Sequence, residues 1–161
     1  MNGRQIGGSA PVSWRALYWS RASKRGSKAA SSRSAAPRLQ YGNWGGSGEP
    51  LVFIPGGSDT AFVFGDVADS LAERFRVVGL TARGCGASDR PVNGYDMDHQ
   101  VGGFRGFIDA LDIERATLIG HSRGGGKITQ FARRYPDRVY RLVYLDTVFR
   151  YVAPGLEENR P

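Results

Sequence analysis

The hydrophobic positions of this chain follow two different periods. Short runs of apolar residues, rich in Val, Ile, Leu and Phe, are separated by longer segments in which apolar residues recur every three or four positions. The short runs are typical of strands buried in a sheet, and the longer segments are typical of helices with one buried face. The pattern predicts strands at 38–44, 51–54, 75–80, 115–119 and 138–145. It predicts the buried helix positions Phe64, Val67, Ala68 and Leu71, then Val101, Phe104, Ile108 and Leu111, and then Ile128, Phe131, Ala132 and Tyr135.

This order of elements predicts the fold class. Strands that alternate with helices of about a dozen residues favour an α/β fold, a three-layer α/β/α sandwich with a mostly parallel central sheet. The chain has 161 residues, of which 40% are hydrophobic. That is enough for one domain with a substantial core.

Composition divides the chain into a tail and a folded core. Residues 1–37 are rich in Ser, Arg, Ala and Gly and have little apolar periodicity, so we expect a disordered basic tail. The eight basic residues up to Gly48 are accompanied by no acidic residue, whereas the remainder carries 14 basic and 15 acidic residues. The net charge of +7 therefore belongs to the tail. We expect the folded core over 38–148, and we expect 149–161 to begin a cap or lid segment or to be unstructured.

One motif carries the candidate chemistry. Residues 120–124 read Gly-His-Ser-Arg-Gly, with a predicted strand before them and a predicted helix after them. This layout is typical of a nucleophile elbow, a sharp strand-to-helix turn that exposes a serine hydroxyl. Gly120 and Gly124 leave room for the tight turn and for the close approach of helix and strand. Ser122 would also lie at a helix N-terminus, which favours developing negative charge. The bare five-residue pattern also fits an ordinary turn, and its strand–helix context favours the nucleophile.

Three motifs, in this order, resemble those of the α/β-hydrolase superfamily, over a span from about Arg38 to Val148. Residues 51–57 (Leu-Val-Phe-Ile-Pro-Gly-Gly) resemble the strand and loop that supply half of an oxyanion hole. Residues 83–91 (Arg-Gly-Cys-Gly-Ala-Ser-Asp-Arg-Pro) resemble the family's Asp-x-Arg-Gly-x-Gly-x-Ser loop, and residues 120–125 are the elbow. Pro55 stands where many members have histidine, and Thr81 replaces the usual aspartate before the second motif.

The resemblance implies a fold and a reaction. It implies an α/β-hydrolase fold, truncated after about the sixth strand, and a serine hydrolase that acts on an ester, amide or related acyl compound through an acyl-enzyme. Ser122 would be the nucleophile, and the backbone N–H groups of Gly57 and Arg123 would form the oxyanion hole. A plain strand-end turn is the alternative interpretation of the Pro-Gly-Gly corner.

The triad of the family is incomplete in this sequence. Its chain order is serine, then aspartate or glutamate, then histidine. The chain's only histidines are His99 and His121, and neither follows Ser122. We therefore expect an N-terminal fragment or an inactive truncated product with little activity alone, because a serine hydroxyl needs a positioned base. A non-catalytic binding protein built on the hydrolase fold is the alternative. Asp146 closes a predicted strand and is either the triad acid or a loop cap.

Other candidate residues have plain structural interpretations. His99 is expected on the surface near the start of a helix. Cys85 is expected to be inert packing, since nothing basic is fixed beside it in the sequence. Arg83 is expected to tether its own loop or to line the entrance.

The sequence implies few partners. No metal-ligand cluster, Gly-rich phosphate loop or flavin fingerprint appears in it, so we expect no cofactor and no metal. We expect a small-molecule acyl substrate, no specific nucleic acid and no membrane span, since no apolar stretch reaches the length of a transmembrane helix. The strand at 138–145 would present an unpaired sheet edge, through which the chain could self-associate. The tail lacks the apolar core of a secretory signal, so we expect a cytoplasmic location, with an organelle transit tail as the alternative.

Overall fold

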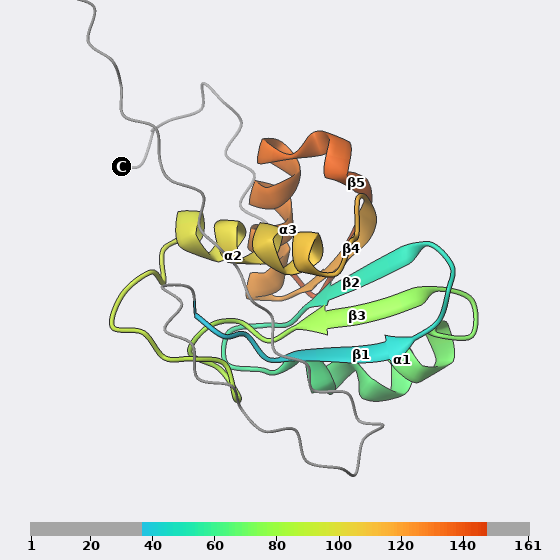
Figure 1. Cartoon of the computed structure of the whole chain (residues 1–161), viewed down its shortest axis with the longest axis horizontal. Helices are drawn as coiled ribbons and strands as arrows, with labels where there is room; N and C mark the ends of the chain where they lie inside the picture. The colour runs from blue at the N-terminus through green and yellow to red at the C-terminus, as the bar shows by residue number, and fades with distance from the viewer. Residues whose placement is uncertain (1–36, 148–161) are drawn as a thin grey trace, which may run out of the picture.

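The computed structural model describes residues 37–147 (Figure 1). The predicted tail, apart from Pro37, and the predicted segment 149–161 lie outside the described residues, and both stay predictions. Within the described range no helix is both long enough and apolar enough to cross a bilayer.

A central sheet of five strands organises the described residues (Figure 1). The strands are β1 (Tyr41–Gly45), β2 (Pro50–Ile54), β3 (Arg76–Leu80), β4 (Ala116–His121) and β5 (Val139–Leu145). Their spatial order is β1-β3-β2-β4-β5. β1 pairs with β3 in the antiparallel direction, and every other neighbouring pair is parallel. The prediction of a mostly parallel central sheet is confirmed.

Helices cover both faces of this sheet. They are η1 (Ala61–Phe64), α1 (Gly65–Leu71), α2 (Met97–Ala110), α3 (Arg123–Arg134) and the short η2 (Pro136–Arg138). In Figure 1, α2 and α3 lie on one side of the sheet and α1 lies on the other. The two hydrophobic clusters follow this division, because β2 contributes Val52 and Ile54 to the cluster with α2 and α3, and Leu51 and Phe53 to the cluster with α1. This alternation is that of a strand buried on both faces, and it confirms the three-layer sandwich.

The second and third predicted helix faces point into the larger cluster. Phe131 of α3 is fully buried, and its ring lies 4.6 Å from the ring of Phe104 and 5.0 Å from the ring of Tyr135. Aromatic pairs at these distances stabilise a core beyond the area they bury. Ala132 and Tyr135 are only partly buried.

The first predicted helix face is only partly right. Phe64 and Ala68 are buried, whereas Val67 is 49% exposed. The helix begins as the 3₁₀ turn η1, and α1 starts only at Gly65. A 3₁₀ turn advances three residues per turn instead of 3.6, so the face that a regular helix would bury is rotated and Val67 turns toward solvent.

Strand β5 forms one edge of the sheet within the described residues. It pairs only with β4, and its exposed side chains include Tyr140, Val143 and Leu145. The predicted open edge is therefore present in this part of the chain. Self-association through it stays a prediction.

Candidate active site

Ser122 occupies the turn between β4 and α3. Its backbone has φ 48° and ψ −119°, and it is the N-cap residue of α3. A residue with a β-carbon rarely adopts this conformation, and such strain costs about 1–3 kcal/mol. Two hydrogen bonds hold the turn: the Ser122 N–H donates to the Leu145 carbonyl over 3.0 Å, and the Gly125 N–H donates to the Ser122 carbonyl over 3.1 Å. The structure therefore has the predicted strand–turn–helix geometry at Ser122.

The glycines on either side of Ser122 are required by close backbone approach. A Cβ atom built on Gly120 would lie 2.8 Å from the backbone of Gly124 and from the Cα of Gly125. A Cβ atom on Gly124 would lie 2.2 Å from the Ile54 carbonyl oxygen. These neighbours are backbone atoms and cannot rotate away. Both glycines therefore let α3 pack directly on β4 and on the end of β2.

The Pro-Gly-Gly corner after β2 lies against the elbow. A Cβ atom on Gly56 would lie 3.4 Å from the Cβ of Ser122, and one on Gly57 would lie 3.3 Å from the Cδ of Arg123. Within residues 37–147, neither the Gly57 amide nor the Arg123 amide donates to a protein acceptor. Both donors are therefore free, and the Arg123 amide belongs to the first turn of α3, where N–H groups have no partner in the helix.

Asp146 is placed at the same edge of the sheet as Ser122. In the β4–β5 register His121 pairs with Leu145, so Ser122 and Asp146 each follow the last paired residue of their strand. Asp146 is exposed, has φ 43°, and makes no hydrogen bond or ion pair within the described residues. It contacts neither histidine through a polar bond.

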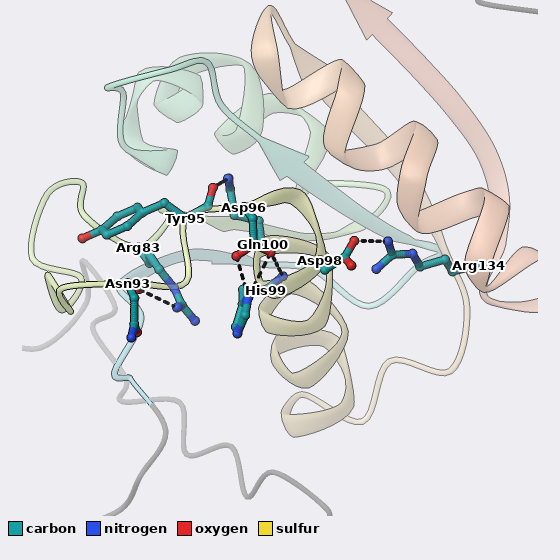
Figure 2. A network of polar contacts seen from close by, with 8 residues as sticks. All are labelled: Arg83, Asn93, Tyr95, Asp96, Asp98, His99, Gln100 and Arg134. Atoms are coloured by element: carbon teal, nitrogen blue, oxygen red, sulfur yellow. Dashed lines mark hydrogen bonds and ion pairs between the residues drawn. The ribbon is translucent and has the colours of Figure 1, made fainter. Parts of the chain in front are cut away.

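The two histidines occupy different places. His99 lies in the first turn of α2, where its Nδ1 is 2.7 Å from a carboxylate oxygen of Asp96 (Figure 2). Its side chain is 63% exposed, so the expected surface position near a helix start is confirmed. The Asp96 carboxylate accepts from the backbone N–H and side chain of His99, and these bonds lower the pKa of Asp96 to about 2. His121 lies beside the corner, with Nδ1 3.3 Å from the Cβ position of Gly56.

The loop between β3 and α2 adds residues from the second motif. The Arg83 guanidinium donates to the Asn93 carbonyl at 3.4 Å, so Arg83 does hold its own loop (Figure 2). The Cys85 thiol lies 3.5 Å from the Gly57 carbonyl oxygen. The fold also places Lys127 of α3 near Cys85. No motif predicts this proximity, since 42 positions separate the two residues.

Sequence reasoning missed two residues next to the elbow. The Thr147 hydroxyl donates to the Gly120 carbonyl over 3.2 Å, and its side chain packs where a Cβ atom of Gly125 would lie. Lys127 is largely buried, and this desolvation lowers the pKa of its ammonium group. Neither residue belongs to a short motif, so only the packing reveals them. Among the residues that the structure describes, no cluster of three or more His, Cys, Asp or Glu could hold a metal ion.

Comparison with known proteins identifies the family. The sequence profile of the alpha/beta hydrolase fold matches residues 49–161. This chain belongs to the α/β-hydrolase family. An uncharacterized protein of Mycobacterium bovis is 40% identical to it over 98 residues, which are 61% of this chain and 29% of that protein. The soluble epoxide hydrolase of a Corynebacterium species is 34% identical over 111 residues, which are 69% of this chain and 37% of that protein.

Solved α/β-hydrolase structures resemble the described fold. The epoxide hydrolase of Bacillus megaterium, solved with an inhibitor, superposes with a TM-score of 0.66 at 30% sequence identity. The match covers 70% of this chain and 40% of that one. The chain thus spans 29–40% of the length of these relatives and this structure. It contains the part of the α/β-hydrolase fold that carries the elbow and the Pro-Gly-Gly corner.

Proposed function

We propose that this chain carries the nucleophile and the oxyanion hole of a serine hydrolase acting on an ester, amide or related acyl compound. The observation that carries the proposal is the strained conformation of Ser122 beside the Pro-Gly-Gly corner. Its backbone is held at φ 48°, and the N–H groups of Gly57 and Arg123 have no acceptor within residues 37–147. Strained backbone of this kind collects at functional sites.

In the proposed reaction the Ser122 Oγ attacks the carbonyl carbon of the substrate. The carbonyl oxygen becomes an oxyanion and accepts hydrogen bonds from the Gly57 and Arg123 amides, which need no reorganisation to receive it. The alcohol or amine then leaves with a proton, and an acyl group stays on the serine oxygen. Water attacks the acyl-enzyme, releases the carboxylic acid and restores the hydroxyl.

The chain offers a candidate for the triad acid and none for the histidine base. Asp146 follows the strand next to the elbow, so a carboxylate there could orient a histidine at the sheet edge. The sequence has no histidine after Ser122 to be oriented. We therefore infer slow turnover for the chain alone, of the order of the 10³–10⁴-fold acceleration over water that remains in triad enzymes without their base.

Chemical rescue tests this proposal on the chain as it exists. Added imidazole should accelerate the hydrolysis of p-nitrophenyl acetate by the wild type, because it can take the proton that no protein histidine takes. The rate with Ser122→Ala, measured at each imidazole concentration, supplies the background. A wild-type rate equal to the Ser122→Ala rate at all concentrations would overturn the proposal.

Epoxide opening is the second candidate. It is favoured by one observation, the similarity to the Corynebacterium and Bacillus megaterium epoxide hydrolases. An epoxide carries no carbonyl, so attack by Ser122 would leave an alkyl ether that water does not readily cleave. Styrene oxide should therefore alkylate Ser122 at most once, whereas multiple turnovers of styrene oxide would favour this second function.

A further inference from the structure

An open groove lies beside the first strand, on the face of the sheet that α1 covers. It has a volume of about 390 Å³, and its lining comes from β1, η1 and α1: Trp44, Phe62, Val63, Gly65 and Asp66. The Trp44 indole lies over Gly42 and Gly79, which pair across β1 and β3, since a Cβ atom on either glycine would be too close to the ring. The Trp44 and Phe62 rings meet edge to face, with centroids 6.2 Å apart.

Apolar side chains stay exposed along this groove. Phe62 is 37% exposed and Val63 is 56% exposed. Val67 follows Val63 by one helical turn, so it continues the same surface, and it is 49% exposed. Single exposed apolar residues are common on proteins, whereas exposed apolar residues that share one surface mark an interaction site. The groove is therefore a candidate docking surface.

The border of the groove is acidic. Residues 59–75 contain four acidic residues and one basic residue, Arg74. Asp66 lines the groove, and Asp69 and Glu73 follow it at intervals of three and four, the spacing of one helix face. All three are exposed, and their carboxylates form no ion pair or hydrogen bond within the described residues. An occupant of this surface should therefore be cationic as well as apolar.

The N-terminal tail of the chain has this composition. Residues 1–36 contain seven basic residues and no acidic residue. All their aromatic residues occur in 14–19, which read Trp-Arg-Ala-Leu-Tyr-Trp, and four basic residues follow in 21–28. An apolar segment followed by a cationic one matches an apolar groove bordered by carboxylates, because apolar burial favours binding and opposite charges favour the correct placement.

The length of the tail suits this contact. Trp19 precedes Pro37, where the described residues begin, by 18 positions, and Pro37 precedes Trp44 by seven. Seven residues span at most about 25 Å, and an unstructured chain of 18 residues has an r.m.s. span of about 21–25 Å. A linker whose length matches the distance gives the highest effective concentration, in the millimolar range for short linkers. Weak contacts then suffice for binding within one chain.

We propose that residues 14–28 bind to this groove of the same chain. The aromatic segment covers the apolar lining, and the basic residues that follow it lie beside the acids of α1. Both parts belong to one chain, so the contact does not depend on protein concentration. Ser122, Gly57 and Arg123 do not line the groove, and the proposed hydrolase chemistry is independent of this contact.

Carbodiimide coupling tests the contact in the full chain. The reagent EDC joins a carboxylate to a lysine amine only where the two groups touch, and Lys24 and Lys28 are the lysines of the tail. We expect amide bonds from these lysines to Asp66, Asp69 or Glu73, located by peptide mass spectrometry in monomeric protein. The initial rate per chain should stay the same after about ten-fold dilution, because an intramolecular contact has a fixed effective concentration.

Matched variants test each part of the surface, with circular dichroism to verify that every variant is folded. The double change Val63→Ser and Val67→Ser should lower the initial coupling rate roughly ten-fold, because it removes two half-exposed apolar side chains from the contact. Val92→Ser, at a fully exposed position, should leave the rate unchanged. Glu73→Gln should slow coupling to Asp69 roughly two- to five-fold, whereas Glu114→Gln, also at an exposed position, should not.

Three results would overturn the proposal. The first is the absence of coupling, or coupling to the exposed Asp137 and Glu114 as fast as to the acids of α1. The second is coupling between chains, with a rate per chain that falls on dilution, which would make a second copy the occupant. The third is a coupling rate that the double valine variant does not lower, because the tail would then be attracted by charge alone and would not use the groove.

Discussion

Replacing Gly124 by alanine should damage the fold through the contact that shapes the elbow. The new Cβ would lie 2.2 Å from the Ile54 carbonyl oxygen and 2.8 Å from the Pro55 carbonyl oxygen. A carbon and an oxygen atom need more than 3 Å, so α3 would have to move away from the end of β2 by roughly an ångström. Overpacking of this kind costs about 1–3 kcal/mol.

Gly126, in the same helix, provides the matched control. A Cβ atom there would meet only the flexible Met97 Cε, at 4.0 Å. Alanine at a free helix position stabilises by about 0.5–1 kcal/mol relative to glycine. The two variants carry the same chemical change two residues apart, and they should differ in the free energy of unfolding by about 2–4 kcal/mol.

Urea unfolding followed by circular dichroism measures this difference. With a urea dependence of about 1–3 kcal/mol per molar for a small domain, a difference of about 2–4 kcal/mol should separate the unfolding midpoints by about 0.7–4 M. Gly124→Ala should have the lower midpoint, and Gly126→Ala a midpoint equal to or above that of the wild type. If Gly124→Ala is as stable as Gly126→Ala, then α3 does not pack on β2 as described, and the steric account of the elbow is wrong.

Three further changes have definite expected outcomes. Ser122→Gly should be at least as stable as Ser122→Ala in urea unfolding, with a free energy of unfolding higher by up to about 1–2 kcal/mol, because glycine adopts φ 48° without strain. Phe131→Ala removes a fully buried ring and should lower the free energy of unfolding by about 3–5 kcal/mol. Val92→Ala, at a fully exposed position, should leave the stability unchanged when both variants are unfolded by heat. The stability advantage of the wild type over Asp96→Asn should be complete above about pH 4 and disappear as the pH falls toward 2, because the backbone and side chain of His99 lower the pKa of the carboxyl group. A stability advantage that persists at pH 2 would contradict the lowered pKa of Asp96.

Sequence alone predicted the elements that are controlled by strong periodicity. The strands ending in Ile54 and Leu80 and the helix faces of Val101 and Phe131 are as expected, since a short continuous apolar run or an apolar residue every three to four positions leaves little choice. The predicted burial of Val67 was wrong because a 3₁₀ turn has no sequence signature comparable to that of a regular helix.

The candidate site was predictable where a motif fixes backbone geometry. The Gly-x-Ser-x-Gly spacing demands a tight turn, so the position of Ser122 between β4 and α3 could be read from the sequence. The burial of Lys127 could not be read from it, because that burial depends on packing of α3 against residues distant in the sequence. The pairing of β4 with β5, which brings Asp146 to the edge beside Ser122, likewise depends on long-range register.

We propose that the Ser122 hydroxyl and the amides of Gly57 and Arg123 face one reacting carbonyl group. A crystal structure of the protein after treatment with a fluorophosphonate ester would locate all three groups around one phosphorus atom. We expect phosphorus bonded to the Ser122 Oγ, with the phosphoryl oxygen about 2.7–3.1 Å from both amide nitrogens. Phosphorus on another side chain, or a phosphoryl oxygen turned away from both amides, would contradict it.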